Sequence, residues 1–228
     1  MRVTRVQLAW DTSCRLVASR YPAVGLFDSV ADAADLDVVF AIEALGNPRL
    51  RQEAGALSIV PADQRISGPG TTPIMSAFTH LNPEGSRFSD GTWGVYYAAN
   101  DLETAVAEVS HHRARFLART AEPPIEVDLR CYRAAVRARL VDLRGKRATA
   151  ELLDPQRYAA SQGFAREQRS AGEAGIVHDS VRRRAGQCVA LFTPKAVVPP
   201  AQQAEHVTLC WDGARIAAWY RKSDARVL

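Results

Sequence analysis

The spacing of hydrophobic and polar residues changes early in the chain. In the stretch FDSVADAADLDVVFAIEAL, residues 27–45, apolar residues recur at helical spacing, and Asp28 or Ser29 is available as the N-cap. This pattern predicts a helical lead-in over residues 1–66. The stretch SGPGTTP, residues 67–73, holds two glycines and two prolines and therefore marks a break before the rest of the chain.

From Ile74 onward the apolar runs are short, and turn residues separate them. We therefore expect an α+β core of short, largely antiparallel strands with flanking helices, forming one compact unit over residues 67–228. The dipeptide Asp212-Gly213 favours a tight type I′ hairpin between the last two strands. A helix is expected over residues 151–172. Strands are predicted for residues 74–81, 94–99, 125–130, 135–143, 175–181, 188–194, 206–211 and 214–222.

Composition narrows the class of protein. Of the 228 residues, 47% are hydrophobic and 24% are charged, as in globular proteins with one sizeable core. The net charge of +4 and the pI near 9.0 suit an anionic ligand or an acidic partner, and they are weak evidence for nucleic-acid binding.

Targeting and metal-binding signals are absent from the sequence. No apolar run is long enough for a signal peptide or a membrane helix. The four cysteines form no CxxC pair and lack paired histidines that would indicate zinc. We therefore expect a cytoplasmic protein with reduced thiols and no metal site. The cysteines are Cys14, Cys131, Cys188 and Cys210.

A helix is also predicted after Asn100, within the stretch SRFSDGTWGVYYAANDLETAVAEVSHH, residues 86–112. Asn100 suits the N-cap and Glu103 follows three residues later, as in a capping box. Glu108 and His112 lie on a stripe that flanks an apolar, core-facing stripe. Glu108 should therefore project from the wall of a cleft. The apolar stripe consists of Leu102, Ala105, Val106 and Val109.

The residue types in this stretch suit one kind of ligand. An arginine fork such as that of Arg87 fits phosphate oxygens, and a tyrosine ring such as that of Tyr97 gives a planar heteroaromatic group a stacking surface. A carboxylate such as Glu108 stabilises a cation that develops at a sugar carbon during glycosidic cleavage. Together they indicate a dinucleotide with a scissile N-glycosidic bond, namely NAD.

Purely structural interpretations compete with this one. Glu108 is equally explained as a solvated carboxylate that forms a weak pair with His112, and Arg87 as a surface charge in a loop. Either Tyr96 or Tyr97 must pack inward, because neighbours in a strand alternate faces. The functional interpretation is favoured because the loop, strand and helix would bring all three residue types together.

The stretch from Ser86 to Arg113 resembles the core of the RES-domain family, named for an arginine, a glutamate and a serine. GIVHDSVRRRAGQCVALFTP, residues 175–194, resembles the family's second motif and places the named serine at Ser180. The resemblance covers residues 74–195, and the lead-in resembles the longer branch of the family. Its members are toxins of RES–Xre toxin–antitoxin pairs and are similar in fold to ADP-ribosyltransferases.

The resemblance implies a role for each matching residue. Arg87 would hold phosphate or ribose, Tyr97 would stack on nicotinamide, and Glu108 would be the catalytic carboxylate. Ser180 would bind the ligand or orient a neighbour. Many members carry an arginine on the first core strand where this chain has His80, which would then contact the adenosine ribose. Whether Arg87 or His80 fills the arginine role stays open.

The remaining polar residues carry weaker signals. Arg182 shares a strand face with Ser180 and is expected to meet a phosphate, and His112 is kept as a partner of Glu108 in the site. Arg183 and Arg184 are expected to be solvated, and His111 to be exposed. His178 shares the face of Ser180 without a motif that assigns it a role. The sequence holds neither GxGxxG nor GxxxxGK[ST], so no Rossmann or P-loop site is indicated.

These observations lead to a hypothesis about function. The protein is expected to be a toxin that cleaves NAD at the nicotinamide bond and transfers ADP-ribose to a protein target. One alternative is an NAD glycohydrolase or phosphorylase without a protein target. Another is a non-catalytic basic binding module, which the run VRRR suggests and the lack of interleaved aromatic residues disfavours. The expected partner is an antitoxin with an Xre-like helix-turn-helix domain that covers the active site, with no direct nucleic acid and no membrane.

Overall fold

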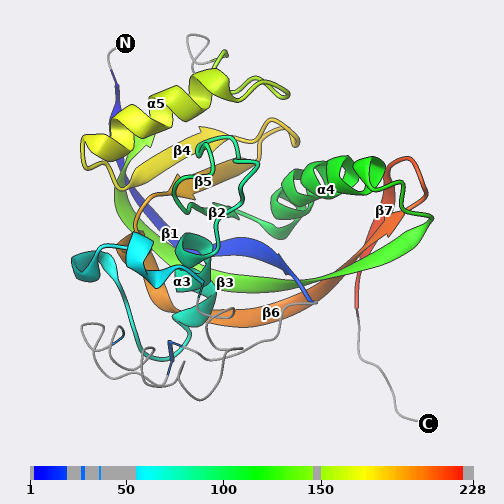
Figure 1. Ribbon diagram of the computed structural model, residues 1–228, viewed down its shortest axis with the longest axis horizontal. Helices are drawn as coiled ribbons and strands as arrows, with labels where there is room; N and C mark the ends of the chain where they lie inside the picture. The colour runs from blue at the N-terminus through cyan, green and yellow to red at the C-terminus, as the bar shows by residue number, and fades with distance from the viewer. Residues whose placement is uncertain (1–2, 20–26, 29–35, 37–54, 146–149, 223–228) are drawn as a thin grey trace.

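The computed structural model describes residues 3–19, 27–28, 36, 55–145 and 150–222. Within these residues, seven strands form one sheet in the order β1-β2-β5-β4-β3-β6-β7 (Figure 1). The strands are β1 (Arg5–Ala18), β2 (Tyr96–Ala99), β3 (Ile125–Asp142), β4 (Gly175–Asp179), β5 (Gln187–Leu191), β6 (Val197–Trp211) and β7 (Ile216–Arg221). The helices are α3 (Thr72–Thr79), α4 (Leu102–Arg119) and α5 (Ala159–Ser170), with short 3₁₀ turns η2 (Leu57–Ile59), η3 (Ala62–Gln64) and η5 (Pro194–Ala196).

The sheet is mixed but mainly antiparallel. Only β3 and β4 pair in parallel among the described strands, and β3 also pairs antiparallel with β1 and β6. Since β1 meets β2 at Cys14 and Ala99 as well as β3, the pairing closes on itself. The expected α+β class with largely antiparallel pairing is confirmed. The separate strands expected over residues 125–130 and 135–143 are one continuous strand, β3.

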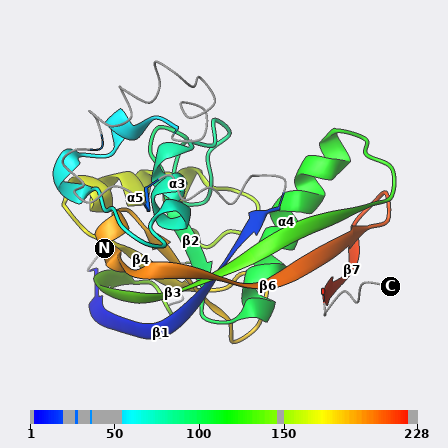
Figure 2. The same ribbon diagram turned by 90° about the horizontal axis from the view of Figure 1, so that it is seen from below.

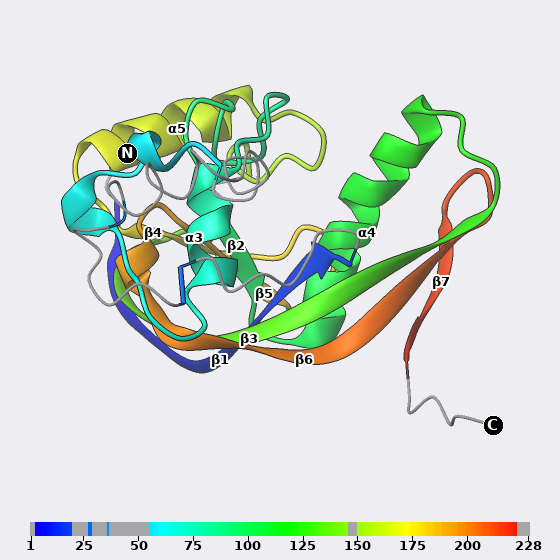
Figure 3. The same cartoon turned by 60° about the horizontal axis from the view of Figure 1, so that its bottom comes forward.

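The helices lie on one side of the curved layer formed by β1, β3 and β6 (Figures 2 and 3). Apolar side chains fill three clusters between these elements. One lies around α3 and β1, one between α4 and the sheet, and one among α5, β4, β5 and the loop before β2. No helix in the described residues is long and apolar enough to cross a bilayer.

Helix α4 begins one residue later than the sequence suggested. Asp101 is the N-cap, and its Oδ1 accepts the backbone N–H of Thr104 at 2.8 Å. Asn100 instead connects the end of β2 to the start of β5. Its Oδ1 accepts the N–H of Gln187, and its own N–H donates to the Gln187 carbonyl. Two adjacent residues that both suit an N-cap compete, and the tertiary contact of Asn100 decides between them.

The helical lead-in expected over residues 1–66 is wrong for Arg5–Ala18, which form β1. Val6, Leu8 and Trp10 alternate with exposed residues and contribute to the cluster around α3, a period of two that is typical of strands. β1 therefore belongs to the sheet of the core. The helix expected over residues 27–45 lies almost entirely outside the described residues.

The strand expected over residues 74–81 is wrong, because this stretch forms α3 and its C-cap. The apolar residues Ile74, Ala77, Phe78 and Leu81 recur at helical spacing, but over so short a run this spacing does not exclude a strand. Pro73 lies in the first turn, where a helix tolerates proline. Gly94 then allows close packing, since a Cβ there would lie 2.3 Å from Phe78 Cα.

Two other expected elements have different limits. The helix expected over residues 151–172 is shorter and begins only at Ala159, because Pro155 and the turns before it interrupt the pattern. The turn between β6 and β7 is longer than a type I′ hairpin. Asp212 Oδ1 accepts the backbone N–H groups of Ala214 and Arg215, and this side-chain contact selects the longer turn.

Candidate functional site

The centre of the candidate site is the carboxylate of Glu108 on α4. Its Oε1 accepts a hydrogen bond from Ser180 Oγ at 2.5 Å, and Cys188 Sγ lies 3.9 Å from the same oxygen. Ser180 follows the end of β4 and is 72 residues away in the sequence. The two motif residues, a glutamate and a serine, therefore meet in space.

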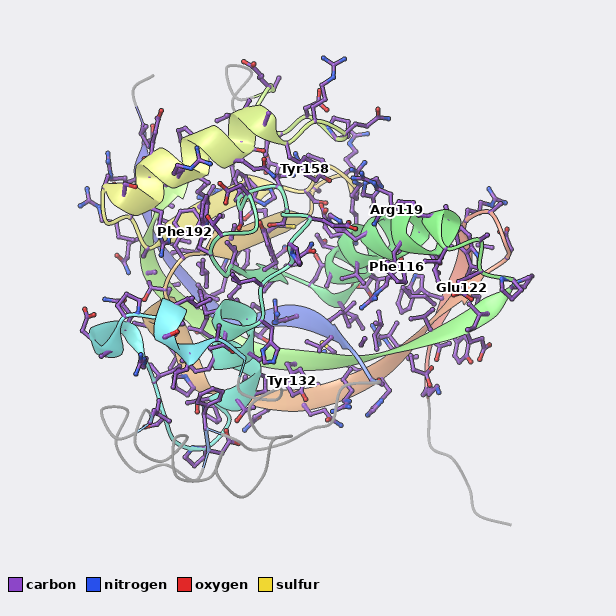
Figure 4. The ribbon with its side chains drawn as sticks, viewed as in Figure 1. Phe116, Arg119, Glu122, Tyr132, Tyr158 and Phe192 are labelled. Carbon is purple, nitrogen blue, oxygen red and sulfur yellow. The ribbon has the colours of Figure 1, made fainter. Side chains whose placement is uncertain are left out.

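Arg87 lies in the loop between α3 and β2 and is only 6% exposed. Its Nη1 donates to the Asp154 carbonyl at 2.6 Å, and its guanidinium lies over the ring of Tyr158, 4.7 Å from the centroid. Figure 4 shows Tyr158 beside this loop, at the N-terminal end of α5. Burial lowers the pKa of Arg87, while the nearby Tyr158 and Glu108 raise it. The expectation of a loop arginine is correct, but the side chain is buried rather than exposed.

Tyr97 on β2 holds the loop on both sides of Arg87. Its hydroxyl accepts the backbone N–H of Phe88 at 2.9 Å and lies 2.7 Å from Ser86 Oγ. Burial raises the pKa of Tyr97 to about 12, so the phenol stays protonated near neutral pH. The ring packs partly into the cluster near α5, and stacking on nicotinamide stays a prediction for this residue.

Further contacts fix the Arg87 loop to both neighbouring helices. Arg119, labelled in Figure 4, is the last residue of α4. It forms a salt bridge of 2.7 Å with Glu84. Asp90 is paired with Arg166 of α5. Hydrogen bonds from Thr92 and Arg166 lower the pKa of Asp90 to about 2. The loop therefore bridges α4 and α5 and is positioned by both.

Arg182 forms a second cationic group near Glu108. One Nη2 contact is with His111 Nε2 at 2.9 Å, and another is with the Pro155 carbonyl. Arg182 Nε is buried and has no hydrogen-bond partner in the described part of the chain. A buried, unsatisfied donor on a cation suits an anionic ligand.

His111 is half-buried against Arg182, so the expectation that it is exposed is wrong. Burial and the adjacent Arg182 lower the pKa of His111 to about 4, which keeps the ring neutral. His112 is exposed, and its ring packs edge-on against that of His111 with centroids 5.5 Å apart. Its role in ligand binding stays a prediction.

His178 and His80 lie in different environments. His178 on β4 is 4% exposed, its ring centroid lies 5.2 Å from that of Phe88, and burial lowers its pKa. His80 is exposed at the C-cap of α3, and its Nδ1 lies 3.2 Å from the Ser76 carbonyl. His80 is thus on a helix end rather than on the strand where it was expected, and contact with ribose stays a prediction.

Sequence patterns did not reveal three of these contacts. Tyr158 and His111 approach the two arginines only in the folded chain. Arg183 is half-buried rather than fully solvated, and its Nη1 donates to Asp101 and Thr104 at the start of α4. Tyr158 precedes α5 without a side-chain capping hydrogen bond, and nothing local in the sequence links it to Arg87.

The arrangement suits a phosphorylated ligand with a scissile glycosidic bond. Arg87 and Arg182 place two cationic groups near the single carboxylate of Glu108, so the local potential is positive around it. A positive potential of this kind favours anionic groups, and a fixed carboxylate stabilises positive charge that develops beside it. No cluster of three or more His, Cys, Asp or Glu that could hold a metal occurs among the described residues.

Comparison with known protein families matches residues 63–212 to the RES domain. The uncharacterized protein y4oC of Sinorhizobium fredii (strain NBRC 101917 / NGR234) is 31% identical over 217 residues, which cover 94% of this chain and 89% of that protein. The chain therefore belongs to the RES-domain family. The family expected from the two sequence motifs is confirmed.

Among solved structures, the crystal structure of the M. tuberculosis MbcT-MbcA toxin-antitoxin complex holds a similar chain. The TM-score is 0.48 and the sequence identity is 10%, and the match covers 92% of this chain and 88% of that chain.

Proposed function

We propose that this protein is the toxin of a toxin–antitoxin pair and that it cleaves NAD at the nicotinamide glycosidic bond, transferring ADP-ribose to a protein target. The observation that carries the proposal is the carboxylate of Glu108, held by Ser180 within electrostatic reach of Arg87. Membership of the RES-domain family supports the same chemistry, since the resemblance implies toxins that act on NAD.

Glu108 would stabilise the charge that develops when the glycosidic bond breaks. In this step the electron pair of the bond between ribose C1′ and the nicotinamide nitrogen leaves with nicotinamide, and positive charge develops on the ribosyl group. Ser180 engages Oε1 of Glu108, so Oε2 is the oxygen that would meet this cation. A preorganised carboxylate stabilises the transition state more than the ground state, as catalysis requires.

The two arginines would bind the pyrophosphate of NAD. Each guanidinium presents a planar set of N–H donors that matches phosphate oxygens. Arg87 is rigidly held by Tyr158 and the Asp154 carbonyl, and Arg182 keeps a buried Nε without a partner in the described residues. These features support a fixed anion site next to Glu108.

The acceptor that attacks C1′ defines the final product. A protein side chain gives an ADP-ribosylated target, water gives ADP-ribose, and inorganic phosphate gives its phosphorylated form. Incubating the purified protein with NAD, with and without phosphate and cell lysate, separates these outcomes by product mass. A labelled protein band in the lysate is the result expected for a transferase, and small products alone would show a glycohydrolase or phosphorylase.

The decisive experiment for the reaction is the substitution Glu108→Gln. Losing a positioned electrostatic group lowers NAD turnover by at least ~10²-fold. NAD binding should change far less, because the shape of the side chain is kept. Nicotinamide release measures the first effect and calorimetric titration the second. A variant that turns over NAD at the wild-type rate would contradict the mechanism.

An enzyme that consumes NAD inside its own cell must be held inactive. We therefore propose that a cognate antitoxin with a helix-turn-helix domain covers the site. Because Arg87 and Arg182 give it a positive potential, an acidic side chain or a free C-terminus of the partner would take the place of the phosphates.

A further inference from the structure

The loop between β4 and β5, residues 180–186, is attached to the first turn of α4. Arg183 Nη1 donates to Asp101 Oδ2 at 3.2 Å and to Thr104 Oγ1 at 3.1 Å. Gly186 packs so closely that a Cβ there would lie 2.5 Å from Thr104 Oγ1. The loop and the start of the helix therefore form one packed unit.

The ends of this loop are also held in place. Ser180 N–H donates to the Gly186 carbonyl at 2.8 Å, which closes the loop. Immediately beyond it, Gln187 N–H donates to Asn100 Oδ1 at 2.9 Å, and Asn100 N–H donates to the Gln187 carbonyl at 3.0 Å. The segment that precedes α4 and the segment that follows the loop thus share a fixed register.

The same loop orients the hydroxyl of Ser180. Its Oγ accepts the backbone N–H of Arg182 at 3.1 Å and that of Arg183 at 3.0 Å. With both acceptor positions of the hydroxyl occupied, its proton is directed to Glu108 Oε1. Arg183 is therefore connected to the site twice, by its N–H to the serine and by its guanidinium to the helix that carries the glutamate.

Helix stability does not explain an arginine at this position. The N-terminus of a helix carries partial positive charge, which disfavours a cation there. The side chains of the Arg183–Asp101 pair are 40% and 32% exposed, and ion pairs at such exposure contribute little to stability. What the contact does supply is a fixed distance between the loop and α4.

We propose that Arg183 is a positioning residue, which holds the Ser180 loop against α4 so that the serine hydroxyl orients the carboxylate of Glu108. This inference rests on the proposed function and adds to it a residue outside the expected site. Arg183 touches neither the expected ligand groups nor the reacting atoms, and it acts through Ser180.

The test compares Arg183→Met with Arg184→Met, its exposed neighbour, for which the structure gives no contact with the site. Arg183→Met should lower kcat for NAD cleavage by about tenfold, since small displacements of a catalytic group have effects of this order or larger. KM and the melting temperature should change little. Arg183→Lys should recover part of the rate, and Arg184→Met should match the wild type. A wild-type kcat in Arg183→Met would overturn the proposal.

A double-mutant cycle with Ser180→Ala separates positioning from a general structural effect. If Arg183 acts through Ser180, Arg183→Met produces no further loss of kcat in the Ser180→Ala background. Losses that multiply would show that Arg183 acts independently of the serine, which contradicts the proposal.

A structural measurement keeps this inference separate from the proposed reaction. Wild-type protein that leaves NAD intact would refute the reaction alone. Crystal structures of Arg183→Met and Arg184→Met then decide the positioning role. The distance from Ser180 Oγ to Glu108 Oε1 should exceed hydrogen-bond length only in Arg183→Met. A retained hydrogen bond in that variant overturns the inference.

Discussion

The hydroxyl of Tyr97 holds the backbone that carries Arg87. The hydroxyl of Tyr97 contacts Ser86 and Phe88, the residues on either side of the arginine. Arg87 is buried, so its position follows that of the loop. The tyrosine therefore positions Arg87, the proposed phosphate-binding residue, through the backbone.

Tyr97→Phe tests this role. The substitution leaves the Phe88 N–H without its acceptor, and an unsatisfied buried donor costs about 1–3 kcal/mol. The free energy of unfolding should fall by this amount in urea denaturation. NAD binding, titrated by calorimetry in the Glu108→Gln background, should weaken as well. Tyr220→Phe is the control, since its exposed hydroxyl binds Glu126 at the surface and should change neither value. Unchanged NAD binding in Tyr97→Phe would limit Tyr97 to a packing role.

His111 should make stability depend on pH in a defined window. Its pKa is lowered to about 4 from an ordinary value of 6.5, by burial and then by Arg182. Between these two pKa values the unfolded chain binds a proton that the folded chain does not. The contribution of His111 to the free energy of unfolding is therefore lost as the pH falls from 6.5 to 4. Over that pH range, the free energy of unfolding should therefore fall less in the His111→Gln variant than in the wild type. Urea denaturation at pH 7 and pH 5 measures the difference, and equal losses would contradict the lowered pKa.

At the scale of elements, the packing between α3 and β2 depends on the absence of one side chain. Gly94 approaches the backbone of α3 so closely that a Cβ would lie 2.3 Å from Phe78 Cα and 2.6 Å from the Ala77 carbonyl. The helix would have to move away from the strand that carries Tyr97. The site therefore depends on a contact made outside it.

The substitution Gly94→Ala should lower the free energy of unfolding by roughly 1–3 kcal/mol, as overpacking does. Gly163→Ala is the matched control, since nothing lies within 4 Å of its added Cβ on α5. There alanine should stabilise the protein by about 0.5–1 kcal/mol, because it favours the helix. Denaturation in urea measures both. Equal effects of the two substitutions would rule out the close approach at Gly94.

Elements were predictable where a pattern had one physical interpretation. The stretches that became β4, β5 and β7 are short and bounded by turn residues, and α4 has a clear apolar stripe. The stretch that became α3 has apolar residues at helical spacing, but over only eight residues this spacing does not exclude a strand. The alternation in β1 was present in the sequence, but it became decisive only through pairing with β3.

At the scale of the whole molecule, the positive potential of the site should determine how the protein is controlled. We expect the purified complex with the cognate antitoxin to cleave NAD much more slowly than the free protein, and co-expression to restore growth. Removing the antitoxin segment that contacts the site should abolish the rescue while its helix-turn-helix domain still folds. A complex that binds and cleaves NAD as fast as the free protein would contradict occupation of the site.

The sequence by itself determined the family, the α+β class and the residue types of the candidate site, because the two motifs and the period of α4 are local patterns. Only the tertiary structure decided that Ser180 meets Glu108, since 72 residues of chain separate them. It also decided that Tyr158 and His111 contact the arginines and that Arg183 binds the start of α4. The physical reason is that hydrogen bonds and ring contacts depend on distances in space, which local propensity and periodicity do not specify.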